Sequence, residues 1–136
     1  MRKPLLSEVI ESEEAIMFKA VHTRDLTAHG SRTAKFEGEP YGAGVSFFLV
    51  DNDPGQGPGL HRHPYDETWV VLSGEAVITA DRVDIEARKG DIVVVTAETP
   101  HKFRNTGTDR LEIMCIHASP RIIQEWLDDD ETGQSA

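Results

Sequence analysis

Short apolar runs separated by turn-forming residues constrain the fold of this chain more than any other feature. The 136 residues include 11 Gly and 7 Pro, which stand between brief apolar segments along most of the chain. Glycine and proline mark turns, and short strands with turns at close spacing are typical of all-β sandwiches and barrels. The sequence therefore predicts an all-β fold.

The apolar runs give the expected strand positions. We expect strands at residues 41–50, 67–72, 75–80, 83–87, 91–95, 101–105 and 111–117. The segment DNDPGQGPG at 51–59 is expected to be a loop, because proline and glycine disrupt regular structure. The run DIVVV at 91–95 is almost continuously apolar, which predicts a strand that is buried on both faces.

The chain length is that of one domain. Residues 1–15 are polar and are expected to form an N-terminal arm, residues 16–128 to form the single folded domain, and residues 129–136 to be a disordered tail. A chain of this size buries a sufficient hydrophobic core without disulfide bonds.

One helix is expected, at residues 120–128. Ser119 is a suitable N-cap, and Pro120 suits the first position of a helix. The apolar side chains that follow have helical spacing and are Ile122, Ile123, Trp126 and Leu127. We interpret this stripe as a surface that packs against the core or an interface.

Charge and cysteine content narrow the function and the location. The formal net charge is −10, and so acidic a surface repels phosphate backbones, which argues against nucleic-acid binding. We expect no signal peptide and no membrane-spanning segment, because the sequence has no apolar run of sufficient length. Cys115 is the only cysteine, which excludes an intramolecular disulfide and favours a cytoplasmic protein.

The segment GQGPGLHRHPYDETWVVLSG at 55–74 carries the strongest functional signal. It contains His61, His63 and Glu67, which share odd numbering. If the segment is one β-strand, all three side chains point to the same face. Buried imidazoles together with a carboxylate need compensation, and a metal ion is the commonest form of it.

A fourth metal-capable group lies in the segment GDIVVVTAETPHKFRN at 90–105. His101 in this segment completes a set of three imidazoles and one carboxylate. Two separate antiparallel strands would carry the two parts of the set and meet across a barrel. Two alternatives stay open: a metal-free polar cluster formed by His61, His63 and Glu67, and a surface position in a turn for His101.

With these two segments the chain resembles the cupin superfamily. The first cupin motif is Gly, five residues, His-x-His, three or four residues, Glu, six residues and Gly. This chain matches it at Gly55, His61, His63, Glu67 and Gly74 without a departure. The resemblance covers about residues 42–118.

The second cupin motif is Gly, five residues, Pro-x-Gly, two residues, His, three residues and Asn. Gly90, His101 and Asn105 match it, whereas Thr96 and Glu98 replace the usual Pro and Gly. These two departures affect turn residues and leave the ligand set intact.

The resemblance implies a double-stranded β-helix (jelly-roll) barrel in a small single-domain cupin, with a divalent metal near one end. Family members bind Mn, Fe, Ni, Cu, Co or Zn through the positions of His61, His63, Glu67 and His101. Three neutral imidazoles and one carboxylate suit these ions better than Mg²⁺ or Ca²⁺. An octahedral ion would keep two positions for a substrate or dioxygen, which favours chemistry at the metal.

These features predict a metal-dependent oxidoreductase of the dioxygenase type that acts on a small organic molecule. The alternatives are a non-catalytic binding module for a small molecule or metal, and a cupin isomerase or decarboxylase. His117 shares a strand face with Cys115 and is a candidate acid or base. The candidate pocket-lining residues, for which core packing is the alternative, are Trp69, Val71, Phe103 and Cys115.

We also expect a homodimer. The N-terminal arm and the stripe of the expected helix at 120–128 each offer a surface that covers a sheet face or exchanges between subunits.

Overall fold

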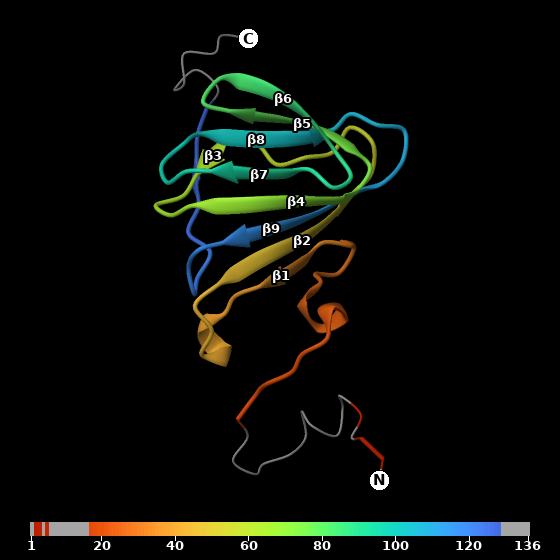
Figure 1. Cartoon of the computed structure of the whole chain (residues 1–136), viewed down its shortest axis with the longest axis vertical. Coiled ribbons are helices and arrows are strands. Elements are labelled where there is room, and N and C mark those ends of the chain that lie inside the picture. Colours follow the sequence, from red (N-terminus) through yellow and green to blue (C-terminus); the bar gives the residue numbers. More distant parts are fainter. Residues whose placement is uncertain (1, 4, 6–16, 129–136) are drawn as a thin grey trace.

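The computed structural model describes residues 2, 3, 5 and 17–128, which fold into two five-stranded sheets (Figure 1). The first sheet has the order β1-β2-β9-β4-β7. Its strands are β1 (Ala34–Phe36), β2 (Ser46–Asn52), β9 (Leu111–His117), β4 (Glu67–Ser73) and β7 (Ile92–Val95). The second sheet has the order β10-β3-β8-β5-β6. Its strands are β10 (Glu125–Trp126), β3 (His61–Arg62), β8 (His101–Asn105), β5 (Glu75–Ala80) and β6 (Val83–Arg88).

The order of the strands along the chain gives the topology of a jelly roll. From β2 to β10 the chain crosses from one sheet to the other at nearly every connection, and β5 and β6 are the one hairpin that stays in its sheet. The strand pairings in the described part of the chain are antiparallel. The predicted all-β double-stranded β-helix is thus confirmed, with short 3-10 turns η1 (Thr23–Leu26) and η2 (Glu39–Tyr41) before the barrel strands.

The core lies between the two sheets and follows from the alternation of side chains along each strand. In β4 and β9 every second residue is buried, as the period of two requires. The buried apolar cluster consists of Val50, Trp69, Val71, Ala76, Ile78, Ala87, Val95, Phe103, Leu111, Ile113 and Cys115. The same alternation that builds this core also directs polar side chains of β3, β4 and β8 inward at one end.

Two strand predictions need correction. The strand expected at 41–50 begins only at Ser46, because η2 and Gly42, which has a φ of 72°, form a turn before it. The strand at 91–95 exists as β7, but the prediction that both faces are buried is wrong. Ile92 and Val94 are 66% and 60% exposed, since β7 is an edge strand and its outer face is uncovered.

The helix expected at 120–128 is also wrong. The chain there is extended and ends in β10, which pairs with β3 through Glu125–Arg62 and Trp126–His61. The guanidinium of Arg62 donates two hydrogen bonds to the carboxylate of Glu125, and the Leu127 amide donates to the carbonyl of Leu60. These tertiary contacts outweigh the weak local preference for a helix.

Two further predictions concern the ends of the chain. The predicted arm at 1–15 lies mostly outside the described residues, and the predicted tail at 129–136 lies entirely outside them. Within the described part of the chain, we find no helix with the length and apolar character needed to cross a membrane.

Two glycines in the loop between β2 and β3 provide a test of the packing. A Cβ atom on Gly57 would stand 1.9 Å from the carbonyl oxygen of Phe103, whereas one on Gly59 would meet nothing within 4 Å. We expect Gly57→Ala to lower the free energy of unfolding by about 3 kcal/mol, because the backbone of β8 must move.

Gly59→Ala is the matched control and should change the free energy of unfolding by less than about 0.5 kcal/mol. Urea unfolding of both variants measures the difference. Equal stabilities would contradict the close approach of this loop to β8.

Candidate metal centre

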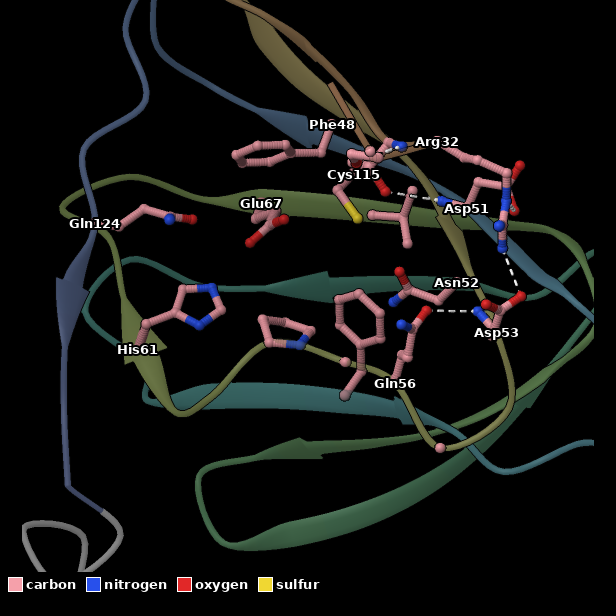
Figure 2. Close-up of a pocket in the computed structure, with 18 of the residues that line it drawn as sticks. Arg32, Phe48, Asp51, Asn52, Asp53, Gln56, His61, Glu67, Cys115 and Gln124 are labelled. Carbon is pink, nitrogen blue, oxygen red and sulfur yellow. Dashed lines mark hydrogen bonds and ion pairs between the residues drawn. The ribbon is translucent and has the colours of Figure 1, made fainter. Parts of the chain in front are cut away.

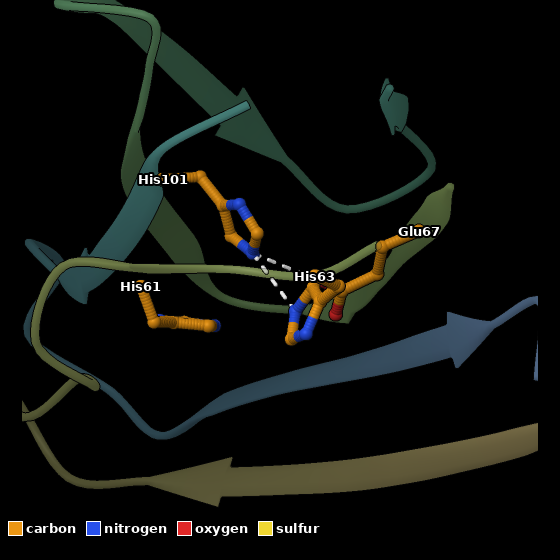
Figure 3. A group of neighbouring side chains, drawn as sticks. All are labelled: His61, His63, Glu67 and His101. Carbon is orange, nitrogen blue, oxygen red and sulfur yellow. Dashed lines mark hydrogen bonds and ion pairs between the residues drawn. The ribbon is translucent and has the colours of Figure 1, made fainter. Parts of the chain in front are cut away.

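Four buried polar side chains meet at one end of the barrel (Figure 3). His61 lies in β3, His63 follows that strand, Glu67 begins β4 and His101 begins β8. His61 and His101 are direct antiparallel partners in the second sheet. One ligand atom from each of the four residues lies within 4.8 Å of the others. The structure therefore brings together the four residues that the sequence predicted as metal ligands.

The reason for their convergence differs from the one expected. The segment from His61 to Glu67 is not a single strand, because β3 ends at Arg62 and the chain turns before β4 begins. Glu67 belongs to the first sheet, and β3 and β8 belong to the second. The four groups meet because the two sheets face each other, and not because they share one face of one strand.

Backbone carbonyl groups fix the orientation of the three candidate imidazole ligands. Each ring has its Nδ1 within hydrogen-bond distance of a carbonyl oxygen. The three contacts are His61 to Gly59 (2.7 Å), His63 to Ile123 (2.8 Å) and His101 to Thr99 (2.7 Å). A carbonyl oxygen only accepts, so each Nδ1 carries a hydrogen and donates it. In the neutral rings the lone pair is then on Nε2, as in histidines that bind metals.

The lone pairs created in this way face one another and a carboxylate. Nε2 of His63 and Nε2 of His101 each lie 3.0 Å from Oε1 of Glu67, and the two nitrogens are 3.2 Å apart. Acceptors at such distances repel unless protons or a cation lie among them. A divalent cation satisfies all of these atoms at once and matches a donor set of imidazole and carboxylate. The four residues can thus hold a divalent transition metal.

The pKa values of the ligands favour metal binding at neutral pH. Burial lowers the pKa of His61 to about 4, with a smaller contribution from the neighbouring ring of His101, so the His61 ring is neutral at pH 7. Burial by itself would raise the pKa of Glu67. In the metal-free site, protons shared with the rings of His101, His117 and His63 outweigh burial and hold the pKa of this carboxyl group well below its usual range, and a bound cation would act in the same direction. The carboxylate is ionised and the His61 ring is unprotonated.

His117 also lies against Glu67, but its Nδ1 faces a hydroxyl group and not a carbonyl oxygen. The hydroxyl of Tyr65 accepts a hydrogen bond from the Ile123 amide at 3.0 Å and lies 2.7 Å from Nδ1 of His117. When this hydroxyl donates to Nδ1, the ring hydrogen of His117 is on Nε2, which lies 3.1 Å from Oε2 of Glu67. The angle there is outside that of a well-formed hydrogen bond, so the contact is a close polar one.

Sequence reasoning missed the part played by Tyr65. Its number continues the odd series of His61, His63 and Glu67, which was the available signal. The ring of Tyr65 stacks on that of His63, with centroids 5.1 Å apart. Tyr65 thus connects the C-terminal segment, His117 and the candidate ligands.

A cavity of about 660 Å³ opens from the metal centre (Figure 2). His61 and Glu67 line it at one end, and of the predicted pocket residues Phe103 and Cys115 also line it. Trp69 and Val71 are fully buried in the core and do not line this cavity. The Trp69 ring instead packs edge-on against His101, with centroids 5.4 Å apart.

Comparisons with known proteins identify the family of this chain. The family model described as a cupin domain matches residues 48–117. A 62-residue segment is 36% identical to an uncharacterized protein of Methanocaldococcus jannaschii. The aligned segment covers 45% of this chain and 50% of that protein. A 64-residue segment is 31% identical to an oxalate-binding protein of Thermotoga maritima. The aligned segment covers 46% of this chain and 53% of that protein. The chain thus spans about half the length of these curated relatives.

Among solved structures, an oxalate decarboxylase from Bacillus subtilis has the same fold. The superposition has a TM-score of 0.73 at 18% identity, and it covers 93% of this chain and 37% of that chain. At this low identity the similarity concerns the fold alone.

The lowered pKa of His61 predicts how the metal-free protein responds to acid. The unfolded ring binds a proton as the pH falls below about 6.5, whereas the folded ring stays neutral until about pH 4. Because the unfolded state then binds more protons, stability decreases as the pH falls between these values, by up to about 3 kcal/mol. Chemical unfolding of chelator-treated protein at several pH values measures this decrease.

The variant His61→Gln should remove most of that dependence between pH 6.5 and 4. His29 is exposed, so His29→Gln is the matched control and should leave the pH profile unchanged. The same slope in both variants would show that His61 is not the group responsible.

Proposed function

Because the chain belongs to the cupin family, we propose that it is a metal-dependent oxidoreductase of the dioxygenase type that acts on a small organic molecule. The proposed metal ligands are His61, His63, Glu67 and His101. One observation carries the proposal: the Nε2 atoms of two ligands point at the Glu67 carboxylate beside a cavity large enough for a substrate.

The position of the ligands relative to the cavity supports a catalytic centre over a structural one. Structural zinc sites are closed and usually rich in cysteine, whereas His61 and Glu67 here line an open cavity. A bound divalent ion would supply Lewis-acid chemistry or oxygen activation at this end of the cavity. The buried thiol of Cys115 is outside the ligand set.

The surrounding residues orient the centre. The carbonyls of Gly59, Thr99 and Ile123 hold the ligand rings, and loss of such outer contacts typically weakens metal affinity or activity 10- to 100-fold. His117, predicted from the sequence as an acid or base, stays a candidate. Its contact with Tyr65 and its close packing against Oε2 of Glu67 favour a residue that positions the carboxylate.

The relatives support a small organic substrate but leave the reaction open. One relative is an oxalate-binding protein and one structural neighbour is an oxalate decarboxylase. Both names concern small organic molecules. A decarboxylase or isomerase therefore remains the alternative within the enzyme class, and a non-catalytic binding module is the alternative outside it.

Oxygen uptake separates the enzyme from the binding module. The iron-loaded protein should consume dioxygen with at least one member of a panel of catechols, thiols and diketones. If no metal supports turnover while one of these compounds binds tightly, the chain is a binding module. Loss of carbon dioxide from a substrate without oxygen uptake would instead indicate a decarboxylase.

The metal ligands are tested directly by substitution. We expect the double variant His61→Ala/His63→Ala to abolish stoichiometric metal, because it removes two of the four donors. Inductively coupled plasma mass spectrometry of the purified protein measures the metal content.

His22 and His29 are exposed, so His22→Ala/His29→Ala is the matched control and should keep one equivalent of metal. A full equivalent in the first variant would mean that the ligands lie elsewhere.

The outer face of the first sheet supports a homodimer. Ile92 and Val94 project from the edge strand β7 and are 66% and 60% exposed, and Leu72 on β4 is 40% exposed. Exposed apolar patches mark association sites, and the outer face at β7 offers such a patch to the same face of a second copy about a two-fold axis. These neutral side chains allow a second copy to pack without burying charge.

The free thiol of Cys115 supports a reducing compartment, which we propose to be the cytoplasm.

Light scattering tests the dimer. The unmodified chain of 15.1 kDa should have twice that mass, and Val94→Lys should convert it to a monomer, because the interface would bury unpaired ammonium groups. Val83 on β6 is equally exposed, at 59%, so Val83→Lys is the control and should stay dimeric. A monomeric wild type, or loss of the dimer in the control alone, would contradict the β7 interface.

A further inference from the structure

The cavity that opens from the metal centre has two chemically different ends. Figure 2 shows His61 and Glu67 toward one end and the group of Arg32, Asp51 and Asp53 toward the other. At about 660 Å³ the cavity has the size of sites that hold drug-sized molecules. A molecule that touches both ends must be elongated.

The middle of the cavity is apolar. Phe48, Val50, Phe103 and Cys115 line it. Burial raises the pKa of the Cys115 thiol well above its usual range, so this group is uncharged and behaves as a small apolar side chain. Two aromatic rings and neutral aliphatic or thiol groups offer a surface suited to the faces and edges of a ring system.

The far end is polar but offers no free positive charge. Among the described residues that line the cavity, Arg32 is the only one with a side chain that is cationic at every physiological pH. Its guanidinium is bound by Asp53 at 2.5 Å and by Asp51 at 3.3 Å. Arg110 also binds Asp51. A carboxylate at this end would therefore meet two existing carboxylates.

The other polar side chains at the far end are neutral and include two amides and the hydroxyl groups of Ser31 and Thr33. Asn52 and Gln56 line the cavity there, and the Gln56 side-chain oxygen already accepts from the Asp53 amide at 2.8 Å. Amides and paired carboxylates together offer both donors and acceptors, a combination that suits hydroxyl or carbonyl groups.

We propose that the site takes an elongated ring-containing molecule: two adjacent oxygens at one end chelate the metal, a fused or linked ring system fills the apolar middle, and neutral hydroxyl or carbonyl groups reach the Arg32 end. The inference rests on the metal centre proposed above and concerns its substrate class. The cavity lining does not suit a small dianion such as oxalate. Oxalate would leave the apolar middle empty and would find no unpaired cationic side chain in the lining.

Binding to the nickel-loaded protein under anaerobic conditions tests the substrate class without any turnover, because nickel accepts six ligands. The probes are 2,3-dihydroxynaphthalene, catechol and oxalate, measured by titration calorimetry after the nickel content has been determined. The second ring should bury additional apolar surface, so the naphthalenediol should bind about tenfold more tightly than catechol. Oxalate should bind more weakly than either.

A substitution in the wall gives an independent measure. Phe48 lines the cavity, whereas its neighbour Phe47 lies on the opposite face of β2, stacked on Phe36. Phe48→Ala should lower the affinity for the naphthalenediol by about tenfold and that for catechol by less than about threefold. The matched variant Phe47→Ala should keep the affinities of the unmodified protein.

The outcomes are distinguishable from a failure of the metal centre. If nickel binds stoichiometrically but oxalate binds most tightly, or the three probes do not bind, the proposed substrate class is wrong while the metal centre stands. If no metal binds, both proposals fail. Because the ranking of the three probes on the unmodified protein is decisive by itself, instability of Phe48→Ala would not prevent the test.

Discussion

The interaction on which the site depends is the hydrogen bond from each ligand ring to a backbone carbonyl. These carbonyls come from three different segments: the loop before β3, the turn before β8 and the chain leading into β10. Each one holds a hydrogen on Nδ1 and so directs the Nε2 lone pair inward. Without them the rings could rotate or change tautomer. The barrel thus brings loops to the places where their carbonyls are needed.

The apolar core packs directly against the polar centre. Trp69 is buried in the core and packs edge-on against the ring of His101, while Phe48 packs edge-on against that of His117. A change in core packing would therefore be transmitted to ligand positions, because close-packed interiors have little freedom to relax. The rigidity of the core and the fixed geometry of the centre have the same origin.

The C-terminal segment shows how tertiary contacts decide a structure that local preferences leave open. Its sequence offers a good N-cap at Ser119 and a helical stripe, which predicted a helix at 120–128. In the fold the segment gains strand pairing with β3, paired charges between Arg62 and Glu125, and contacts of Ile123 with His63 and Tyr65. Several such contacts exceed the fraction of a kcal/mol per residue by which helix propensities differ.

The sequence by itself determined most strands of the barrel and the four candidate ligands, because side-chain alternation, turn residues and motif spacing are local properties of the chain. It did not determine that β7 has an exposed face, that His61 and Glu67 lie in different sheets, or that Tyr65 reaches His117. Those features depend on which strands become edges and which segments meet across the barrel. Only the tertiary structure decided them, since the groups involved are distant in sequence and become neighbours through the pairing and facing of the two sheets.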